Sequence, residues 1–270
     1  MTIDFDSITI DDLRRRGGVK WSAVPGAIGA FVAEMDFGVA PNISRALHAA
    51  IDDGVLGYLP SALGQQMSAA TARWTADRYG WTVDPADVHP LPDVLAGLRL
   101  AIDRFSRAGA PVIVPTPAYM PFLTVPPSLG REVIEVPMLI DAEGRYTLDL
   151  DGIDAAFRAG ANLLVLCNPY NPVGRVFTRD ELVAVGEVVQ RHDGRVFSDE
   201  IHAPLVYAPG IHVPYASISP EAAAHTVTTT SASKAWNLPG LKAAQLILSS
   251  DADREAWDNG LFGIKGVGGV

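Results

Sequence analysis

The sequence predicts an α/β protein of three layers, in which a mainly parallel sheet is covered by helices on both faces. Three observations predict this fold class. Short apolar runs alternate with segments of helical period, which is the pattern of βαβ units. Several of the runs are apolar throughout, as expected of strands covered on both faces. The 25 glycines and 20 prolines fall between the periodic segments, where they are typical of loops.

Three segments are predicted helices. Residues 42–53 and 94–107 repeat apolar side chains at the helical period, so each is expected to be an amphipathic helix. Thr178 and Glu181 form a capping-box pattern ahead of residues 182–192. That third helix is expected to cross between two parallel strands.

Six runs are predicted strands of the sheet. They are residues 111–115, 131–136, 162–167, 195–198, 226–230 and 244–249. In an open α/β sheet, ligands bind beyond the carboxyl ends of the strands. The loops that follow these runs are therefore the expected place for chemistry.

Charge and composition exclude several function classes. The net charge of −10 and the pI of about 5.0 argue against a nucleic-acid partner held by a basic field. Cys167 is the only cysteine, so neither an intrachain disulfide nor a cysteine metal cage is expected, and a reducing compartment is favoured. The first residues lack a signal-peptide pattern, and no run approaches a membrane span. We expect a cytoplasmic protein with no membrane or nucleic-acid partner and no metal.

Two predicted strands are followed by polar side chains suited to a ligand. NPYNPVGR at 168–175 is typical of a tight turn, because Asn and Pro favour turns and Gly174 supplies a positive φ. Asn171 in that loop also offers an amide donor to a ligand oxygen. Asp199 ends the run at 195–198, where a carboxylate either caps the chain or holds a proton on a buried heterocyclic nitrogen.

The loop after residues 226–230 contains a candidate nucleophile. Lys234 follows a strand of buried type and lies among small hydroxyl residues, Ser231 and Ser233, with Lys242 eight positions later. Most lysines are solvated surface groups. An amine that is partly desolvated has a lowered pKa, however, and reacts with an aldehyde.

Residues 91–98, LPDVLAGL, open the helix at 94 and form a candidate phosphate site. Asp93 is the natural N-cap, and the amides of Val94 and Leu95 are expected to reach a phosphate at the helix N-terminus. The four loops together offer an amine, a carboxylate, an amide and a phosphate cradle. That set matches what pyridoxal 5'-phosphate (PLP) requires.

The motifs NPYNPVG, SDEIH and SASKAWNLPGLK occur in this order, together with VAEMDF at 32–37, GVLGYLP at 54–60, PTPAYMPF at 115–122 and EIHAPLVY at 200–207. On these motifs the chain, from about residue 17 to about 250, resembles fold-type I PLP enzymes of the class I/II aminotransferase superfamily. It looks most like the MalY/PatB-type cystathionine β-lyases, which are carbon–sulfur lyases. His202 stands where aminotransferases usually carry a tyrosine, as in the lyase branch.

The resemblance implies roles for the reactive end of the cofactor. Lys234 would form the Schiff base with PLP and then move the substrate Cα proton. Asp199 would keep the pyridine nitrogen protonated, and Asn171 would bond the phenolic oxygen. Tyr119 would stack on the ring, and His202 would lie beside the cofactor.

It also implies how the phosphate is held and shared between subunits. Lys242, in the place of an arginine common in aminotransferases, would hold the phosphate with Ser231 and the amides of Val94 and Leu95, and Ser233 would also be a cofactor-binding residue. Tyr58 would reach the phosphate of a neighbouring subunit in a homodimer. Both Tyr119 and Tyr58 also suit ordinary packing positions.

The resemblance implies a PLP-dependent lyase that cleaves an S-substituted cysteine, such as cystathionine, to a thiol, pyruvate and ammonia. Two alternatives stay open: an aminotransferase, and a PLP-binding or regulatory protein without turnover. The expected domains are an N-terminal arm at 1–40 that is part of a small domain, a PLP-binding large domain at 41–255 and a Gly-rich tail at 256–270. The C-terminal small domain, which supplies the carboxylate-binding arginine in such enzymes, is expected to be absent. Arg254, the only arginine after Lys234, has no physical reason to take that role.

Overall fold

The computed structural model describes residues 4–259. The chain divides into two compact units, one formed by Met1–Tyr58 with Ala232–Leu241 and the other by Leu59–Ser231 with Lys242–Val270. The domain ranges expected from the sequence divide the chain differently and stay a prediction. Of the expected Gly-rich tail, residues 260–270 lie outside the described residues.

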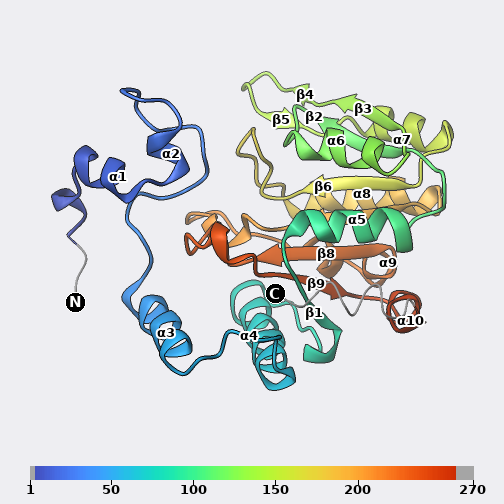
Figure 1. The fold of residues 1–270 in the computed structure, drawn as a ribbon. Coiled ribbons are helices and arrows are strands. Elements are labelled where there is room, and N and C mark those ends of the chain that lie inside the picture. Colours follow the sequence, from blue (N-terminus) through green and yellow to red (C-terminus); the bar gives the residue numbers. More distant parts are fainter. Residues whose placement is uncertain (1–3, 260–270) are drawn as a thin grey trace. The chain divides into compact units, whose positions relative to one another are not determined.

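The second unit is built on a seven-stranded sheet in the order β1-β9-β8-β7-β6-β2-β3 (Figure 1). Strands β3, β2, β6, β7 and β8 are parallel neighbours, and β9 runs antiparallel to both β8 and β1. The strands are β1 (Val88–Leu91), β2 (Val112–Thr116), β3 (Val133–Pro137), β6 (Leu163–Cys167), β7 (Arg195–Asp199), β8 (Thr226–Ser231) and β9 (Ala244–Leu248). A separate two-stranded ribbon pairs β4 (Leu139–Ile140) with β5 (Tyr146–Thr147).

All six predicted strands are confirmed, and β1 was not predicted. Its sequence is VHPL, four residues long, and Pro90 cannot donate to a ladder. A proline weakens a strand pattern, and β1 lies at the edge of this sheet, where fewer ladder hydrogen bonds are required. The apolar character of the central strands is also explained, because every residue of β6 is buried.

Helices cover both faces of the sheet, so the predicted three-layer α/β class is confirmed. α5 and α6 contact each other on one face, and α7, α8 and α9 form a contiguous group against the other (Figure 1). The helices of this unit are α4 (Ser61–Tyr79), α5 (Val94–Arg104), α6 (Pro121–Ser128), α7 (Leu150–Arg158), α8 (Arg179–Arg191), α9 (Pro220–Ala224) and α10 (Asp251–Asn259).

The local signals at the helix starts are confirmed. Glu181 Oε2 accepts the Thr178 N–H at 2.7 Å, and the Glu181 N–H donates to Thr178 Oγ1 at 3.3 Å, which completes the capping box of α8. At α5, Asp93 Oδ1 accepts the Ala96 N–H at 2.9 Å. Each of these two crossover helices therefore begins at the residue its sequence predicts.

A close approach of α5 to the sheet fixes where its N-terminus lies. A Cβ added at Gly97 would lie 2.3 Å from Thr229 Cγ2 on β8, so only glycine lets the helix pack this closely. The helix end is held as well, because the buried Arg131 guanidinium donates to the Ile102 carbonyl at 2.7 Å and to the Arg107 carbonyl at 2.7 Å. α5 is thereby fixed along its length.

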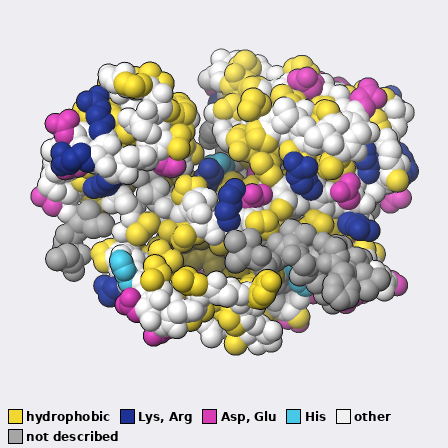
Figure 2. Space-filling model, viewed as in Figure 1, with side chains coloured by type: hydrophobic (Ala, Val, Ile, Leu, Met, Phe, Trp, Pro, Cys, Tyr) yellow, Lys and Arg dark blue, Asp and Glu magenta, His cyan; other side chains and the backbone are white. Residues whose placement is uncertain are grey.

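The first unit contains α1 (Ile10–Arg16), α2 (Val19–Ser22) and α3 (Pro41–Asp52), the last of which confirms the helix predicted at 42–53. Within this unit, the Asp36 carboxylate accepts hydrogen bonds from Lys20 Nζ at 3.1 Å and from Trp21 Nε1 at 2.8 Å. Among residues 4–259, no helix combines the length and apolar character that crossing a membrane requires. On the face of the second unit drawn in Figure 2, acidic and basic side chains are interspersed.

Candidate active site

The candidate site lies at the carboxyl edge of the sheet in the second unit. Because β2, β6, β7 and β8 are parallel, the loops that follow them emerge at one edge. The register pairs Cys167 with Asp199 and Asp199 with Thr229. The ends of β2 and β6, which precede Tyr119 and Asn171, and Ser231 at the end of β8 therefore share this edge with Asp199.

Asp199 is a buried carboxylate at the centre of the edge. It is 3% exposed, and its Oδ1 accepts the Ile201 N–H at 3.0 Å. Its backbone carbonyl accepts the Asn168 N–H at 2.9 Å. Burial, followed by the charge of Asp199, raises the pKa of the Cys167 thiol well above its usual value. Cys167 is therefore held as an inert thiol.

Tyr119 lies within electrostatic reach of both ends of the candidate site. Partial burial raises the pKa of Tyr119, the charges of Asp199 and Asp93 raise it further, and Lys242 acts in the opposite direction. The ring is 39% exposed and packs edge-to-face on Phe122, with 5.4 Å between centroids. An accessible, neutral aromatic face thus adjoins the carboxylate.

The candidate phosphate site lies where α5 begins. Lys242 Nζ lies 3.1 Å from Asp93 Oδ2, while Asp93 caps the helix with its other oxygen. The sequence interpretation of Asp93 as the cap is therefore confirmed. Within the described part of the chain, the N–H groups of Val94 and Leu95 have no hydrogen-bond acceptor. Two unfilled amides beside an ammonium group suit a phosphate.

The strand register places Ser231 near the start of α5. Leu91 pairs with Ala244, and Ala244 pairs with Ser231, so the row across β1, β9 and β8 brings Ser231 level with the start of α5. The Ser231 hydroxyl is buried and donates to the Ala243 carbonyl at 2.7 Å. Its hydrogen is thus used within the protein, and a role in holding phosphate stays a prediction.

The loop at 168–175 is a tight turn, as its composition predicts. The Tyr170 N–H donates to the Arg175 carbonyl at 2.7 Å, and the Gly174 N–H donates to the Tyr170 carbonyl at 2.7 Å. Gly174 has a φ of +71°. Asn171 is half-buried within this turn, and His202 is half-buried just before a short 3-10 helix, Ala203–Leu205. Their contact with a ligand stays a prediction.

The lysine loop belongs to the first unit, where Asn237 fixes it. Asn237 Oδ1 accepts the Met35 N–H at 2.9 Å, and its Nδ2 donates to the Met35 carbonyl at 2.9 Å and to the Gly38 carbonyl at 2.8 Å. The VAEMDF motif thereby holds the turn that contains the half-buried Lys234. Sequence reasoning missed Asn237, although an asparagine after a candidate lysine is a signal for a structured turn.

Three predicted site residues, Lys234, Ser233 and the 96% exposed Tyr58, lie in this first unit. Their convergence with the sheet edge stays a prediction. The six residues whose positions the edge brings together are Asp199, Tyr119, Val94, Leu95, Ser231 and Lys242.

Two further charged residues, Glu200 and Arg254, make hydrogen bonds within the protein. Glu200, which sequence reasoning did not single out, is 3% exposed and accepts from Ser198 Oγ at 2.9 Å. The DE pair at the end of a buried strand was the available signal. The Arg254 guanidinium donates to both carboxylate oxygens of Asp87, with both nitrogen–oxygen distances 2.7 Å.

Comparison with known proteins places the chain in a family. The family described as aminotransferase class I and II matches residues 32–259. The chain is 41% identical over 251 residues to a cystathionine beta-lyase of Corynebacterium glutamicum, covering 93% of this chain and 66% of that protein. It is 33% identical to cystathionine beta-lyase PatB of Bacillus subtilis, covering 92% and 66%.

A solved structure gives the same result for the fold. Cystalysin from Treponema denticola, whose crystal structure contains PLP, superposes with a TM-score of 0.85 at 29% identity, covering 95% of this chain and 66% of that one. The chain thus spans 66% of the length of both curated relatives. Since the family pattern matches from residue 32 to residue 259, this chain belongs to the aminotransferase class I and II family.

Proposed function

We propose that this chain is a PLP-dependent lyase that cleaves the carbon–sulfur bond of an S-substituted cysteine of the cystathionine class. The products are a thiol, pyruvate and ammonia. One observation carries the proposal: Asp199 is a buried carboxylate at the carboxyl edge of the sheet, and its charge affects the pKa of Tyr119. The charges of Asp93 and Lys242, at the start of α5, affect the pKa of the same tyrosine. The 41% identity to a cystathionine beta-lyase supports the substrate class.

The donor set of the edge fits PLP. The unfilled amides of Val94 and Leu95, with Lys242 beside them, suit the phosphate. Asp199 suits the pyridine nitrogen, because a buried carboxylate stabilises a cation next to it. When bound, PLP supplies an electron sink that stabilises negative charge on the Cα of an amino acid.

Each proposed site residue has a separate role toward the bound cofactor. Asp199 would hold a proton on the ring nitrogen, and the Asn171 amide would donate to the phenolic oxygen. Tyr119, which is 39% exposed, would contact the ring. His202, Ser231 and Ser233 would contribute to the same cofactor site. These groups fix the ring and its charge before the substrate arrives.

With PLP bound, Lys234 would hold the cofactor and would serve as the general base for the substrate Cα proton. A residue spans at most about 3.6 Å, so chain connectivity keeps the Lys234 Cα within about 11 Å of the Ser231 Cα at the end of β8. The Lys234 side chain extends beyond its Cα, which brings its amine within range of the end of β8. We also propose that residues 41–255 form the cofactor-binding domain and residues 1–40 an arm.

Product analysis tests the proposed function. The purified chain is loaded with PLP and given cystathionine, and pyruvate is measured with and without an added keto acid. Pyruvate formation without a keto acid is expected. Amino transfer that depends on the keto acid would show an aminotransferase instead, and PLP binding with neither product would show a protein without turnover.

Two lysine variants form a matched pair in that assay. Lys234→Ala removes the proposed base and is expected to abolish pyruvate formation at any PLP concentration. Lys242→Ala removes one phosphate contact, so its activity is expected to return when PLP is raised. Equal losses in both variants that PLP does not reverse would contradict the assigned roles.

We further propose that the protein acts in the cytoplasm as a homodimer in which Tyr58 reaches the partner's phosphate. Tyr58 is 96% exposed, as a side chain that waits for a partner should be. Mixing Tyr58→Phe and Lys234→Ala protein tests the sharing. If sites are shared, the mixed dimer contains one intact site and regains activity. No recovery from a verified mixed dimer would contradict it.

A further inference from the structure

One loop of the second unit leaves the sheet at the candidate site and then returns to it. It covers residues 201–214, between the end of β7 and a short 3-10 helix at Tyr215–Ser217. Asp199 and Glu200 directly precede the loop, and His202 lies within it. Whatever fixes this loop therefore also fixes the surroundings of two proposed cofactor residues.

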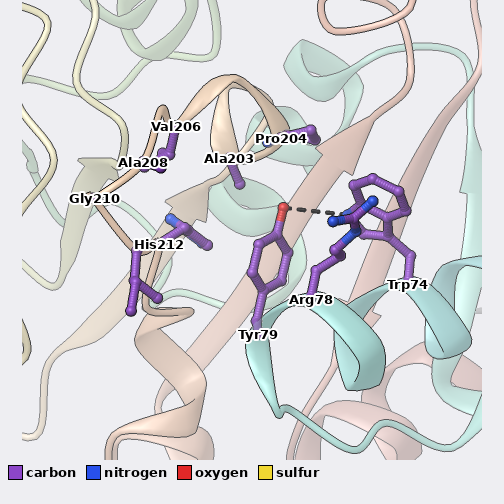
Figure 3. Close-up of a pocket in the computed structure, with 10 residues that line it drawn as sticks. Trp74, Arg78, Tyr79, Ala203, Pro204, Val206, Ala208, Gly210 and His212 are labelled. Carbon is purple, nitrogen blue, oxygen red and sulfur yellow. Dashed lines mark hydrogen bonds between the residues drawn. The ribbon is translucent and has the colours of Figure 1, made fainter.

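The middle of this loop is loosely packed. Tyr207 is 85% exposed, and Ile211 is 73% exposed. A cavity of about 330 Å³ lies between residues 203–212 and the C-terminal end of α4, where Arg78 and Tyr79 line the opposite wall (Figure 3). The position of the loop therefore depends on how its two ends are held.

The buried Glu200 carboxylate joins these two ends. Glu200 is 3% exposed, and its Oε1 accepts from Ser198 Oγ at 2.9 Å and from the Tyr215 N–H at 3.0 Å. Its Oε2 lies 2.8 Å from His212 Nε2. Ser198 belongs to β7, whereas His212 and Tyr215 lie where the loop returns. One side chain thus ties the start of the loop to its end.

Asp199 and Glu200 point to opposite faces of the sheet, because side chains alternate along a strand. Thr229 packs against Gly97 of α5 and pairs in register with Asp199, so Asp199 faces α5. Ser198 is one residue earlier on β7, so it faces away from α5, and its hydroxyl donates to Glu200. Glu200 therefore acts on the candidate site through the backbone and does not touch the cofactor.

The backbone that Glu200 fixes also orients the two proposed cofactor residues. Asp199 Oδ1 accepts the Ile201 N–H at 3.0 Å. The Glu200 carbonyl accepts the Ala203 N–H at 3.0 Å, so the chain turns tightly through His202. A shift of the loop would move the Ile201 amide away from the Asp199 carboxylate and would displace His202.

We propose that Glu200 is a positioning residue, which sets the Asp199 carboxylate and His202 by holding the loop at residues 201–214 to the sheet. The effect on the cofactor rests on the proposed function. The anchoring of the loop does not, because it is measured on the chain without PLP.

Hydrogen exchange on the full chain without PLP tests the anchor. Glu200→Ala removes all three contacts and is expected to speed exchange in the peptide at residues 201–206 about tenfold. Glu200→Gln keeps an oxygen acceptor for Ser198 and Tyr215, so its exchange is expected to stay within about threefold of the wild type. His212→Ala breaks only the contact at the far end of the loop. Its expected effect is about threefold, and it replaces Glu200→Ala if that variant does not fold.

Asn162→Ala is the matched control. Asn162 is also buried, and its side chain bonds the Arg107 N–H at 2.7 Å and the Asp193 carbonyl at 3.2 Å, before the start of β6 at the opposite edge of the sheet. This variant loses buried hydrogen bonds as well, but it is expected to leave exchange at residues 201–206 unchanged.

A spectroscopic measurement tests the positioning of Asp199. The protein is loaded with PLP that carries ¹⁵N at the pyridine nitrogen. In Glu200→Ala, or in His212→Ala if the first variant does not fold, the nitrogen resonance is expected to move toward that of the unprotonated ring. Asn162→Ala is expected to keep the wild-type resonance.

Several outcomes would overturn the proposal. Wild-type exchange at residues 201–206 in both Glu200→Ala and His212→Ala would refute the anchor, as would equal effects of Glu200→Ala and Asn162→Ala or of the alanine and glutamine variants. Faster exchange with an unchanged nitrogen resonance would refute the positioning of Asp199. A wild-type chain that binds no PLP would instead contradict the proposed function, and the exchange measurement would still decide the anchor.

Discussion

Substituting Asn237 should loosen the lysine loop by an amount that its contacts define. Its side chain makes three hydrogen bonds to the backbone of Met35 and Gly38. Three bonds at about 0.5–1.5 kcal/mol each give roughly 2–4 kcal/mol of lost local stability in Asn237→Gly. Asn237 has a φ of +58°, which glycine accepts and alanine does not. Asn237→Ala should therefore cost about 1 kcal/mol more than Asn237→Gly.

Hydrogen exchange at the Met35 amide measures this loss directly, because that amide donates to Asn237. A loss of 2 kcal/mol corresponds to exchange about 30-fold faster in the peptide that contains Met35. Exchange in β6, which lies in the other unit, serves as the internal control and should not change. Native exchange at Met35 in Asn237→Gly, or equal effects of the glycine and alanine variants, would refute the reasoning.

Three further predictions concern stability and cofactor affinity. Gly97→Ala places a methyl group 2.3 Å from Thr229 Cγ2 and should lower the free energy of unfolding by about 1–3 kcal/mol in urea. Gly64→Ala, on α4 with its nearest atom at 3.7 Å, should be neutral or stabilising, and equal effects of the two variants would contradict this account. Burial, and then the charge of Arg195, lowers the pKa of His225 to about 4 from 6.5. The unfolded chain therefore binds the proton more readily, so stability should fall by about 2 kcal/mol from pH 7 to pH 5. His225→Gln should flatten this part of the urea-midpoint profile, and an unchanged slope would show that other groups cause it. Lys242→Ala should weaken PLP binding about tenfold in an absorbance titration, less at high salt, and an unchanged affinity would remove Lys242 from the phosphate site.

The sheet was predictable because its strands are buried on both faces. A run such as residues 163–167 has no polar position, and few structures other than a covered strand accommodate it. β1 was missed for the converse reason, since an edge strand of four residues with a proline has no such pattern. Helix starts were predictable from Asp93 and Thr178, because capping is local chemistry.

The candidate site was predictable only where one strand end fixes one residue. Asp199 follows directly from the end of β7. Asn237 and Glu200 were not predictable in their roles, because their partners lie elsewhere in the chain: Met35 is 202 residues from Asn237, and Tyr215 is 15 residues from Glu200. Such pairs form through tertiary packing, which a local pattern does not record.

The identity of the lysine that holds PLP tests the central claim most directly. The chain has four lysines: Lys20, Lys234, Lys242 and Lys265. After incubation with PLP and reduction with borohydride, peptide mapping should find the pyridoxyl group on Lys234, at one group per chain. A pyridoxyl group on another lysine, or spread over all four without preference, would contradict the proposed active site.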